Sequence, residues 1–253
     1  LYKKFIHDYN KKMWMVDNVS ELDTFNWSPR GPSIASGEKK VFHDRISAYP
    51  IKLNGYDDYW PIATKESKVL LNTTIESYDI EKKEFVIKGD KIKFDIVVST
   101  ISPDVFFNSC HGKLPYLGRD FYPFILPVEE AFPKDVYFLY YAGLGKVTRC
   151  VEYKKLTRYK SKNTLLGIET PSLSNELYPL PIQKWINLAE KYCKMMPEGV
   201  YSVGRKGVYR YGLDFDRCID HGMIVAKDLK NGGGGSGSAL SIDPTGEVNR
   251  VAK

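Results

Sequence analysis

The sequence predicts a mixed α/β protein that combines an antiparallel sheet, part of a parallel sheet and a C-terminal helix. Three observations support this prediction: amphipathic helical patterns in both halves of the chain, hairpin patterns between residues 68 and 100, and two short apolar runs that begin at Ile96 and Val200. A short apolar run without alternation is typical of a strand buried in a parallel sheet. The 253 residues, 43% apolar and 13% aromatic, supply ample material for a core.

The first third of the chain is expected to contain a helix, a loop and several strands. Apolar residues recur at helical spacing over residues 1–13, and Pro, Ser and Gly interrupt any pattern over residues 17–40. β-rich segments then follow one another up to residue 100. The expected strands are Val69–Leu71, Thr74–Ile80, Phe85–Ile87 and Ile92–Phe94, the last two paired as a hairpin around Lys88–Lys91.

The middle of the chain is expected to form a buried strand over residues 96–101, a short helix capped by Ser102–Asp104, and then an antiparallel sheet. The strands of that sheet are predicted over residues 135–142, 146–153 and 164–169.

The last third is predicted to contain a helix over Gln183–Met196, a second buried strand over Val200–Gly204 and a terminal helix. The terminal helix would be capped by Asp214 or Asp216 and would end near Lys230. Two buried strands are too few for a stable parallel sheet, so the chain is expected to be the second half of a larger fold. The inward face of the terminal helix is expected to carry Cys218, Ile219, Val225, Ala226 and Leu229.

Residues 232–238 read GGGGSGS, which is typical of a constructed flexible linker, so residues 1–231 are interpreted as the folded region. Residues 239–253 resemble a short strand that runs into a turn. This tail is interpreted as a tethered peptide or tag foreign to the parent protein. The alternative is a segment added to fill a groove in this chain or in a partner, and the sequence leaves both open.

Charge and hydropathy exclude several classes of protein. The mean hydropathy is −0.35, and the longest markedly apolar run, Asp95–Ile101, is far shorter than the roughly 20 residues that a bilayer requires. No secretory pattern begins at residue 1, so a cytoplasmic location and no membrane partner are expected. The net charge of +6 is spread along the chain, which disfavours nucleic acid and suits a small phosphorylated ligand.

No metal or disulfide framework is expected, because the four cysteines and four histidines show no paired spacing. The basic, tyrosine-containing runs at residues 153–155 and 158–160 could contact nucleic acid, but a solvated strand edge is the favoured interpretation.

A series of short segments resembles, in chain order, the motifs of one enzyme family, UDP-galactopyranose mutase. The segments are Tyr9–Trp14 (YNKKMW), Glu21–Leu22, Arg30–Pro32, Phe42–Arg45, Asn54–Tyr56, Val98–Thr100 with Pro103, Thr148–Arg149 with Glu152, Glu176–Pro179, and Gly204–Arg205 with Tyr209–Tyr211 and Asp214. The resemblance extends from Leu1 to about Asn231. The family consists of flavoenzymes that interconvert the pyranose and furanose forms of UDP-galactose.

The resemblance implies the second half of a flavoprotein-type two-domain fold, with FAD as the cofactor. In the family the reduced flavin N5 attacks the anomeric carbon, UDP leaves, and the sugar recloses as a furanose. The family begins with a GxGxxG turn that binds the dinucleotide, and residues 1–231, which exclude the Gly/Ser linker, contain no GxGxxG. The resemblance therefore implies a partner: a second chain or missing N-terminal half that carries the dinucleotide-binding motif.

The resemblance also implies roles for individual residues. Arg30 and Arg149 match the arginines that contact the diphosphate and sugar, and a guanidinium fork suits phosphate oxygens. Substrate binding is implied for five aromatic residues and cofactor binding for two residues; each of the aromatic residues could instead be an ordinary core residue. The aromatic residues are Phe5, Tyr9 and Trp14 at the uracil and Tyr178 and Tyr211 at the diphosphate, and the residues facing the flavin are Arg205 and Asp214.

Some positions depart from the family pattern. Val41 replaces a uracil-side tyrosine, and residues 139–140 replace a sugar-binding asparagine. The residues implied at the nucleotide therefore match the family pattern better than the residues implied at the sugar. Two functions therefore remain: the substrate-binding half of a mutase-like isomerase, or a non-catalytic UDP-sugar-binding or protein-interaction scaffold that has lost flavin. Flavin content distinguishes them.

Overall fold

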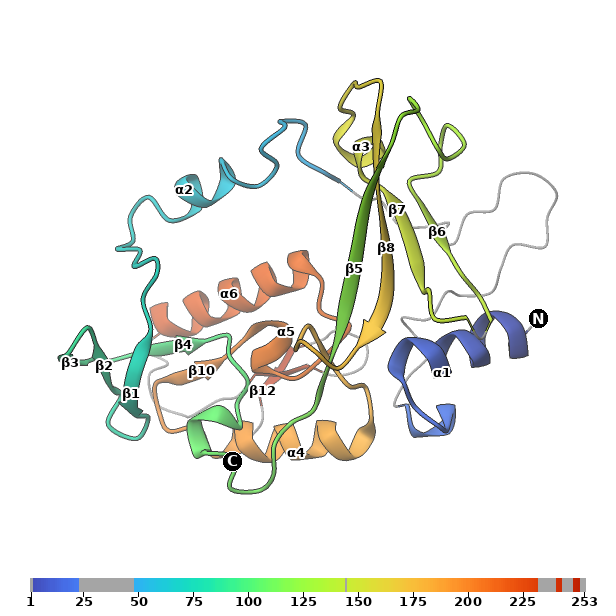
Figure 1. Ribbon diagram of the computed structural model, residues 1–253. Helices are drawn as coiled ribbons and strands as arrows, with labels where there is room; N and C mark the ends of the chain where they lie inside the picture. The colour runs from blue at the N-terminus through green and yellow to red at the C-terminus, as the bar shows by residue number, and fades with distance from the viewer. Residues whose placement is uncertain (1, 23–47, 144, 232–239, 243–247, 251–253) are drawn as a thin grey trace. The chain divides into compact units, whose positions relative to one another are not determined.

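The computed structural model describes residues 2–22, 48–143, 145–231, 240–242 and 248–250 (Figure 1). The chain divides into two compact units. Unit 1 comprises Leu1–Ser20, Phe25–Leu70 and Leu117–Asn175, and unit 2 comprises Glu21–Thr24, Leu71–Tyr116 and Glu176–Lys253. Antiparallel sheets, a parallel strand pair and a long helix near the C-terminus are all present, which confirms the predicted fold class.

Unit 1 is built on an antiparallel sheet. Its strands lie in the order β6 (Phe138–Tyr140), β7 (Arg149–Glu152), β8 (Thr164–Ser172) and β5 (Tyr116–Leu126). The three predicted strands are confirmed, although β6 and β7 are shorter than the apolar pattern suggested. The longest strand, β5, was missed because Gly118 and Pro123 interrupt its β pattern.

The N-terminal helix of unit 1 is confirmed. A π-helical turn, η1 (Lys3–His7), continues into α1 (Asp8–Trp14), which ends where Met15 adopts a left-handed conformation. Tyr9, Asn10 and Trp14 are the buried residues of α1. A 3-10 turn, η2 (Val19–Glu21), follows, and most of the predicted loop over residues 17–40 lies outside the described residues.

Two short helices complete the described part of unit 1. Helix α3 (Tyr153–Thr157) connects β7 to β8, and α2 (Tyr59–Ala63) has no buried residue. The rings of Tyr56, Tyr59 and Trp60 contact one another edge to face along this exposed segment.

Unit 2 begins with a three-stranded antiparallel sheet. Strands β1 (Ile75–Asp79), β2 (Glu84–Ile87) and β3 (Asp90–Lys93) pair in sequence order, and the β2–β3 hairpin confirms the prediction. Lys88 and Gly89 both have positive φ values, 54° and 81°, as a tight hairpin turn requires. The predicted strand over residues 69–71 is wrong, because these residues form no strand and their side chains are between 46% and 78% exposed.

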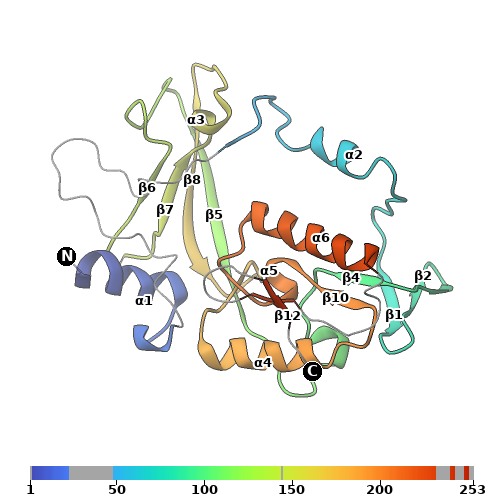
Figure 2. The same cartoon turned by 180° about the vertical axis from the view of Figure 1, so that it is seen from behind.

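The parallel part of the fold consists of β4 (Val97–Ser99) and β10 (Val200–Ser202), which lie side by side. Figures 1 and 2 show α4 (Gln183–Lys194) and α6 (Phe215–Lys230) on opposite sides of these strands. Strand β10 is buried throughout, but Val98 of β4 is 50% exposed. The prediction that β4 is buried on both faces is therefore wrong. The physical reason is that α6 packs against Tyr201 and Val203, so Val98 is left uncovered.

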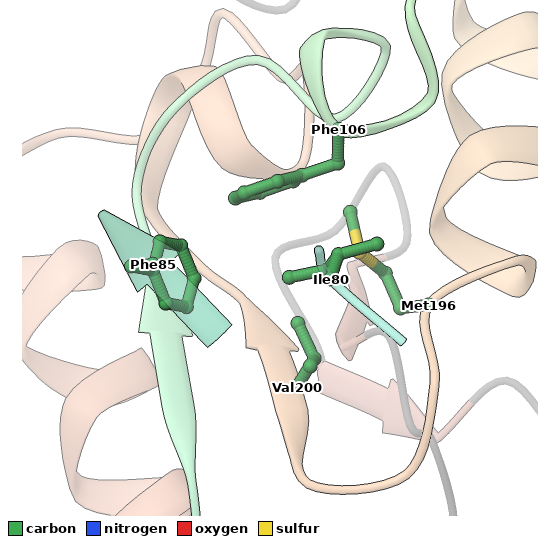
Figure 3. Close-up of a cluster of buried hydrophobic side chains, with 5 residues drawn as sticks. All are labelled: Ile80, Phe85, Phe106, Met196 and Val200. Carbon is green, nitrogen blue, oxygen red and sulfur yellow. The ribbon is translucent and has the colours of Figure 1, made fainter. Parts of the chain in front are cut away.

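The core of unit 2 joins the hairpin sheet to the parallel strands. Met196, which follows α4, is 1% exposed, and it lies in one cluster with the 3-10 turn η3 (Val105–Phe107) (Figure 3). The buried members of the cluster are Ile80, Phe85, Phe106, Met196 and Val200. A helix was expected after residues 102–104, and only this short turn forms there, because the buried Asp104 carboxylate accepts hydrogen bonds from Ser109 Oγ and Leu114 N instead of capping the turn.

Helix α6 confirms the predicted terminal helix and its start at Asp214, but not its buried face. Val225 is buried, whereas Ile219 is 43% exposed, and Ala226 and Leu229 are exposed as well. The expected inward stripe is therefore wrong for these three residues. The buried positions are His221 and Val225, four residues apart, which make a narrower contact than the apolar pattern suggested.

The remaining elements of unit 2 are short. Strand β9 (Tyr178–Pro179) and helix α5 (Gly204–Gly207) carry site residues. In the tail, β11 (Leu240–Ile242) and β12 (Val248–Arg250) pair as an antiparallel hairpin. The predicted linker over residues 232–238 lies outside the described residues, and the origin of the tail stays a prediction.

Across the residues that the structure describes, none of the helices is long and apolar enough to span a membrane. In that same part of the chain, no group of three or more His, Cys, Asp or Glu side chains is placed to hold a metal ion.

Candidate functional site

Arg149 of β7 is held by a buried carboxylate on the neighbouring strand. Arg149 and Glu169 lie directly opposite each other in the β7–β8 register. The guanidinium donates to Glu169 through Nε (2.9 Å) and through Nη2 to both carboxylate oxygens (2.7 and 2.8 Å). The Glu169 side chain is 4% exposed and that of Arg149 is 33% exposed. The hydrogen bonds to Glu169 therefore fix the orientation of the guanidinium, while the side chain remains partly accessible to an anion.

Aromatic side chains of β6 border Arg149. The guanidinium carbon lies 6.0 Å from the centre of the Phe138 ring. Burial raises the pKa of the Tyr140 hydroxyl, and the nearby charge and hydrogen bond of Arg149 partly counteract that shift. Tyr140 therefore stays a neutral phenol beside the guanidinium at neutral pH, able to donate a hydrogen bond. It occupies part of the stretch where the sequence departs from the family asparagine.

The aromatic residues of the first helix occupy different depths. Phe5 in η1 is half-buried, Tyr9 is 5% exposed and Trp14 is 1% exposed. The Tyr9 ring meets Tyr140 edge to face, with 5.8 Å between ring centres. Tyr9 is thus brought next to the Arg149 site, whereas Trp14 is a core residue here and would have to be uncovered before a base could stack on it. Arg30, the other predicted diphosphate ligand, lies outside the described residues.

Four residues predicted as site residues converge in unit 2. The Arg205 guanidinium carbon lies 5.6 Å from the centre of the Tyr178 ring and 5.5 Å from that of Tyr211. The two tyrosine rings meet edge to face at 5.3 Å. Arg205 also donates to Asp214 Oδ1 (3.1 Å) and to the backbone oxygen of Leu213 (2.9 Å). We call Tyr178, Arg205, Tyr211 and Asp214 the Arg205 cluster.

The Arg205 cluster is partly open to solvent and combines cationic, aromatic and hydroxyl groups. The Arg205 side chain is 29% exposed and that of Asp214 is 63% exposed. Cation–π contacts on two rings hold the guanidinium in place without neutralising it, and Asp214 is too exposed to bind it strongly. The arrangement can therefore accept an anion while offering tyrosine hydroxyls as donors.

The backbone at the end of β10 sets the direction of Arg205. Gly204 has a φ of +74° and a Cβ there would meet only Thr100 Cγ2, at 3.8 Å, so the position requires glycine for its conformation and not for lack of space. Its backbone N–H donates to His221 Nδ1 (3.1 Å). Gly204 and Arg205 come shortly after the end of β10, and Thr100 comes directly after the end of β4. All three residues therefore lie at the carboxyl ends of parallel strands, where ligands of α/β proteins bind.

Sequence reasoning missed Glu169. The only available signal was weak: Glu169 is a carboxylate in a predicted strand, on the face that it shares with Leu165 and Gly167, opposite to Leu166 and Ile168. Once such a carboxylate is buried in a sheet it requires a cationic neighbour. It also missed Lys206, whose ammonium lies 4.9 Å from the centre of the Tyr116 ring and 3.8 Å from Glu176. Lys206 carried no distinguishing signal, because it follows Arg205 in a short basic run.

Comparison with known proteins gives two findings. The family model described as UDP-galactopyranose mutase matches residues 4–211. The solved structure titled "Crystal structure of reduced UDP-Galactopyranose mutase" has a TM-score of 0.63 and 14% sequence identity, and the similarity covers 91% of this chain and 64% of that one. A search of curated proteins found no match. Because the family model covers most of its length, the chain belongs to the UDP-galactopyranose mutase family.

Proposed function

We propose that this chain is the substrate-binding part of a UDP-galactopyranose mutase-type isomerase, which converts UDP-galactopyranose to UDP-galactofuranose. The observation that carries the proposal is the Arg205 cluster. Tyr178 comes from one family-like segment and Arg205, Tyr211 and Asp214 from another, and all four meet around one partly exposed guanidinium. Separate motifs that converge on one cation are expected of an anion-binding site.

In this proposal Arg149 is the diphosphate and sugar ligand of unit 1. A UDP leaving group gains negative charge as the glycosidic bond breaks, and a fixed guanidinium stabilises that charge without having to reorganise. Glu169 holds the fork in place by two nitrogen atoms. Tyr140 adds a neutral hydroxyl donor beside it, and Tyr9 supports the Tyr140 ring.

The residues present fit one side of a flavin site. The absence of a side chain at Gly204, its positive φ and the position of Arg205 at a strand end are what close approach of a cofactor requires. Arg205 and Asp214 are the residues that would hold FAD, and reduced flavin supplies the covalent chemistry of ring contraction when bound.

The proposal includes a partner that carries the dinucleotide-binding motif, because residues 1–231 contain no GxGxxG. The half-exposed Val98 of β4 and the 42% exposed Ile101 support such a partner, since apolar side chains at the edge of a two-stranded parallel sheet are normally covered.

The proposed function is tested by calorimetric titration of the purified chain with UDP and with uridine. Arg149→Lys keeps the charge but loses the fork, so UDP affinity is expected to fall about tenfold or more while the weaker uridine affinity changes little. Arg217→Lys is the matched control, because Arg217 lies on the exposed face of α6, where it pairs only with Asp220 at 3.5 Å among the interactions described.

Two results would contradict this function. One is a cooperatively folded chain that binds no UDP, and the other is an Arg149→Lys variant whose UDP affinity equals that of Arg217→Lys. UDP binding without a visible flavin band, even in the presence of added FAD and partner, would favour the alternative of a UDP-sugar-binding scaffold that has lost flavin.

A further inference from the structure

Lys12 connects helix α1 to the turn between β6 and β7. From the last turn of α1 its ammonium donates to the backbone oxygens of Tyr141 (2.5 Å) and Val147 (2.7 Å). Tyr141 directly follows β6, and Val147 lies two residues before β7 begins. One cation therefore closes both ends of the turn, in addition to the backbone hydrogen bond from Tyr141 N to Thr148 O.

The segments joined by Lys12 carry predicted site residues. The Lys12 ammonium lies 5.7 Å from the centre of the Tyr9 ring, one helical turn earlier in α1. The Tyr9 ring contacts Tyr140, the last residue of β6, and Val147 is followed by Thr148 and Arg149. Lys12 is thus at the centre of a short chain of contacts that connects Tyr9 to the strand of Arg149.

The contacts of Lys12 distinguish it from a phosphate-binding lysine. Two of its three ammonium donors are used by backbone carbonyls within the protein. Burial lowers the pKa of the Lys12 ammonium, in keeping with a group that is partly withdrawn from water. Its neighbour Lys11 has no side-chain hydrogen bond or ion pair among those described, so the contacts depend on the position in the helix and not on the basic run alone.

We propose that Lys12 is a positioning residue for the Arg149 site: it fixes α1 against the β6–β7 turn and thereby sets the position of Tyr9 relative to Arg149. This inference rests on the proposed function, because it assigns Lys12 a role in nucleotide-sugar binding without direct contact with the ligand.

The test uses full-length Lys12→Met, with Lys12→Arg as the conservative variant and Lys11→Met as the matched control. Hydrogen exchange is measured by mass spectrometry on peptides that cover α1 and the β6–β7 turn, and UDP affinity by calorimetry. In Lys12→Met, both peptides are expected to exchange faster, and UDP affinity to fall about tenfold. Lys12→Arg can still donate to two carbonyls, so its exchange rates and UDP affinity are expected to be close to those of the wild type. Lys11→Met is expected to leave both the exchange rates and the UDP affinity unchanged.

The two readouts separate this inference from the function on which it rests. If the wild-type chain binds no UDP, the proposed function fails, and the exchange of the two peptides still decides whether Lys12 couples them. If Lys12→Met exchanges like Lys11→Met, the coupling is overturned. If exchange rises while UDP affinity stays at the wild-type value, the role of Lys12 is structural only and the positioning proposal is overturned.

Discussion

At the scale of single residues, a buried carboxylate partner orients the guanidinium of Arg149. Glu169 is almost completely buried, and its carboxylate is satisfied by Arg149 on the next strand. A buried charge is tolerated only when it is paired and hydrogen-bonded, so this pair fixes the direction of the guanidinium. The Arg149 side chain is 33% exposed, and this exposed part is available to bind a ligand.

His221 is a further buried ionisable residue with a defined partner. It is 1% exposed, and its Nδ1 accepts the backbone N–H of Gly204, which places the ring proton on Nε2. Among the described residues Nε2 has no hydrogen-bond partner. Burial lowers the pKa of His221, although the nearby Asp220 acts in the opposite direction.

We expect this burial to make stability depend on pH. Below about pH 6.5, the unfolded chain protonates this histidine and the folded chain does not, so the free energy of unfolding should decrease as the pH falls toward the lowered folded-state pKa. Urea unfolding at pH values from about 7.5 to 5.5 should show a steeper loss in the wild type than in His221→Gln. Equal slopes for the two proteins would exclude a contribution from His221, and His111→Gln, at an exposed site, controls for the removal of one imidazole.

At the scale of elements, the short segment after β10 determines the site of unit 2. Gly204 adopts a left-handed conformation, which turns the chain so that Arg205 meets Tyr178 and Tyr211. Helix α6 then begins at Phe215 with Asp214 at the N-cap position, but the Asp214 side chain makes no capping hydrogen bond. The Asp214 carboxylate accepts a hydrogen bond from Arg205 instead, so it does not stabilise the helix as a side-chain cap.

Two glycine substitutions separate conformation from packing. Gly204→Ala should destabilise the protein by about 1–2 kcal/mol, because a Cβ finds space there but strains a backbone with φ of +74°. Gly222→Ala in α6 should stabilise it by about 0.5–1 kcal/mol, because Gly222 is helical and a Cβ would meet nothing within 4 Å. Chemical denaturation of both variants measures the difference. Changes of the same sign would refute the conformational role of Gly204.

At the scale of the whole molecule, large apolar side chains remain uncovered in each unit. In unit 1 they cluster around α2, where Ile51 is 86% exposed, Ile62 69% and Trp60 52%. In unit 2 they include Val98 and the 65% exposed Met223 of α6. Patches of this kind mark surfaces that bind another protein segment.

We therefore expect that the chain does not form a stable monomer by itself and that a partner covers its exposed apolar surfaces. Alone it should bind the dye ANS and self-associate, because its apolar surfaces are open to solvent. Co-expression with a dinucleotide-binding N-terminal half from a mutase should give a defined complex with reduced ANS binding and a visible flavin band. A chain that is monomeric, melts sharply and binds no ANS by itself would contradict the need for a partner.

The hairpins and helices could be predicted locally because their patterns are local. The β2–β3 hairpin follows from its turn residues, and α4 from apolar residues at helical spacing with a stop at Pro197. Strand β5 could not be predicted, since Gly118 and Pro123 interrupt its pattern and its pairing with β8, a strand distant in the sequence, defines it. The outward position of Ile219 in α6 likewise depends on which neighbours the helix meets.

The sequence by itself determined the mixed α/β class, the order of the main elements and the family motifs, because periodicity, turn chemistry and short motif spacings are properties of neighbouring residues. Only the tertiary structure decided which residues meet: Glu169 behind Arg149, Tyr178 and Tyr211 around Arg205, and Trp14 in the core. The physical reason is that burial and charge pairing depend on contacts between residues distant in sequence, which a local pattern does not contain.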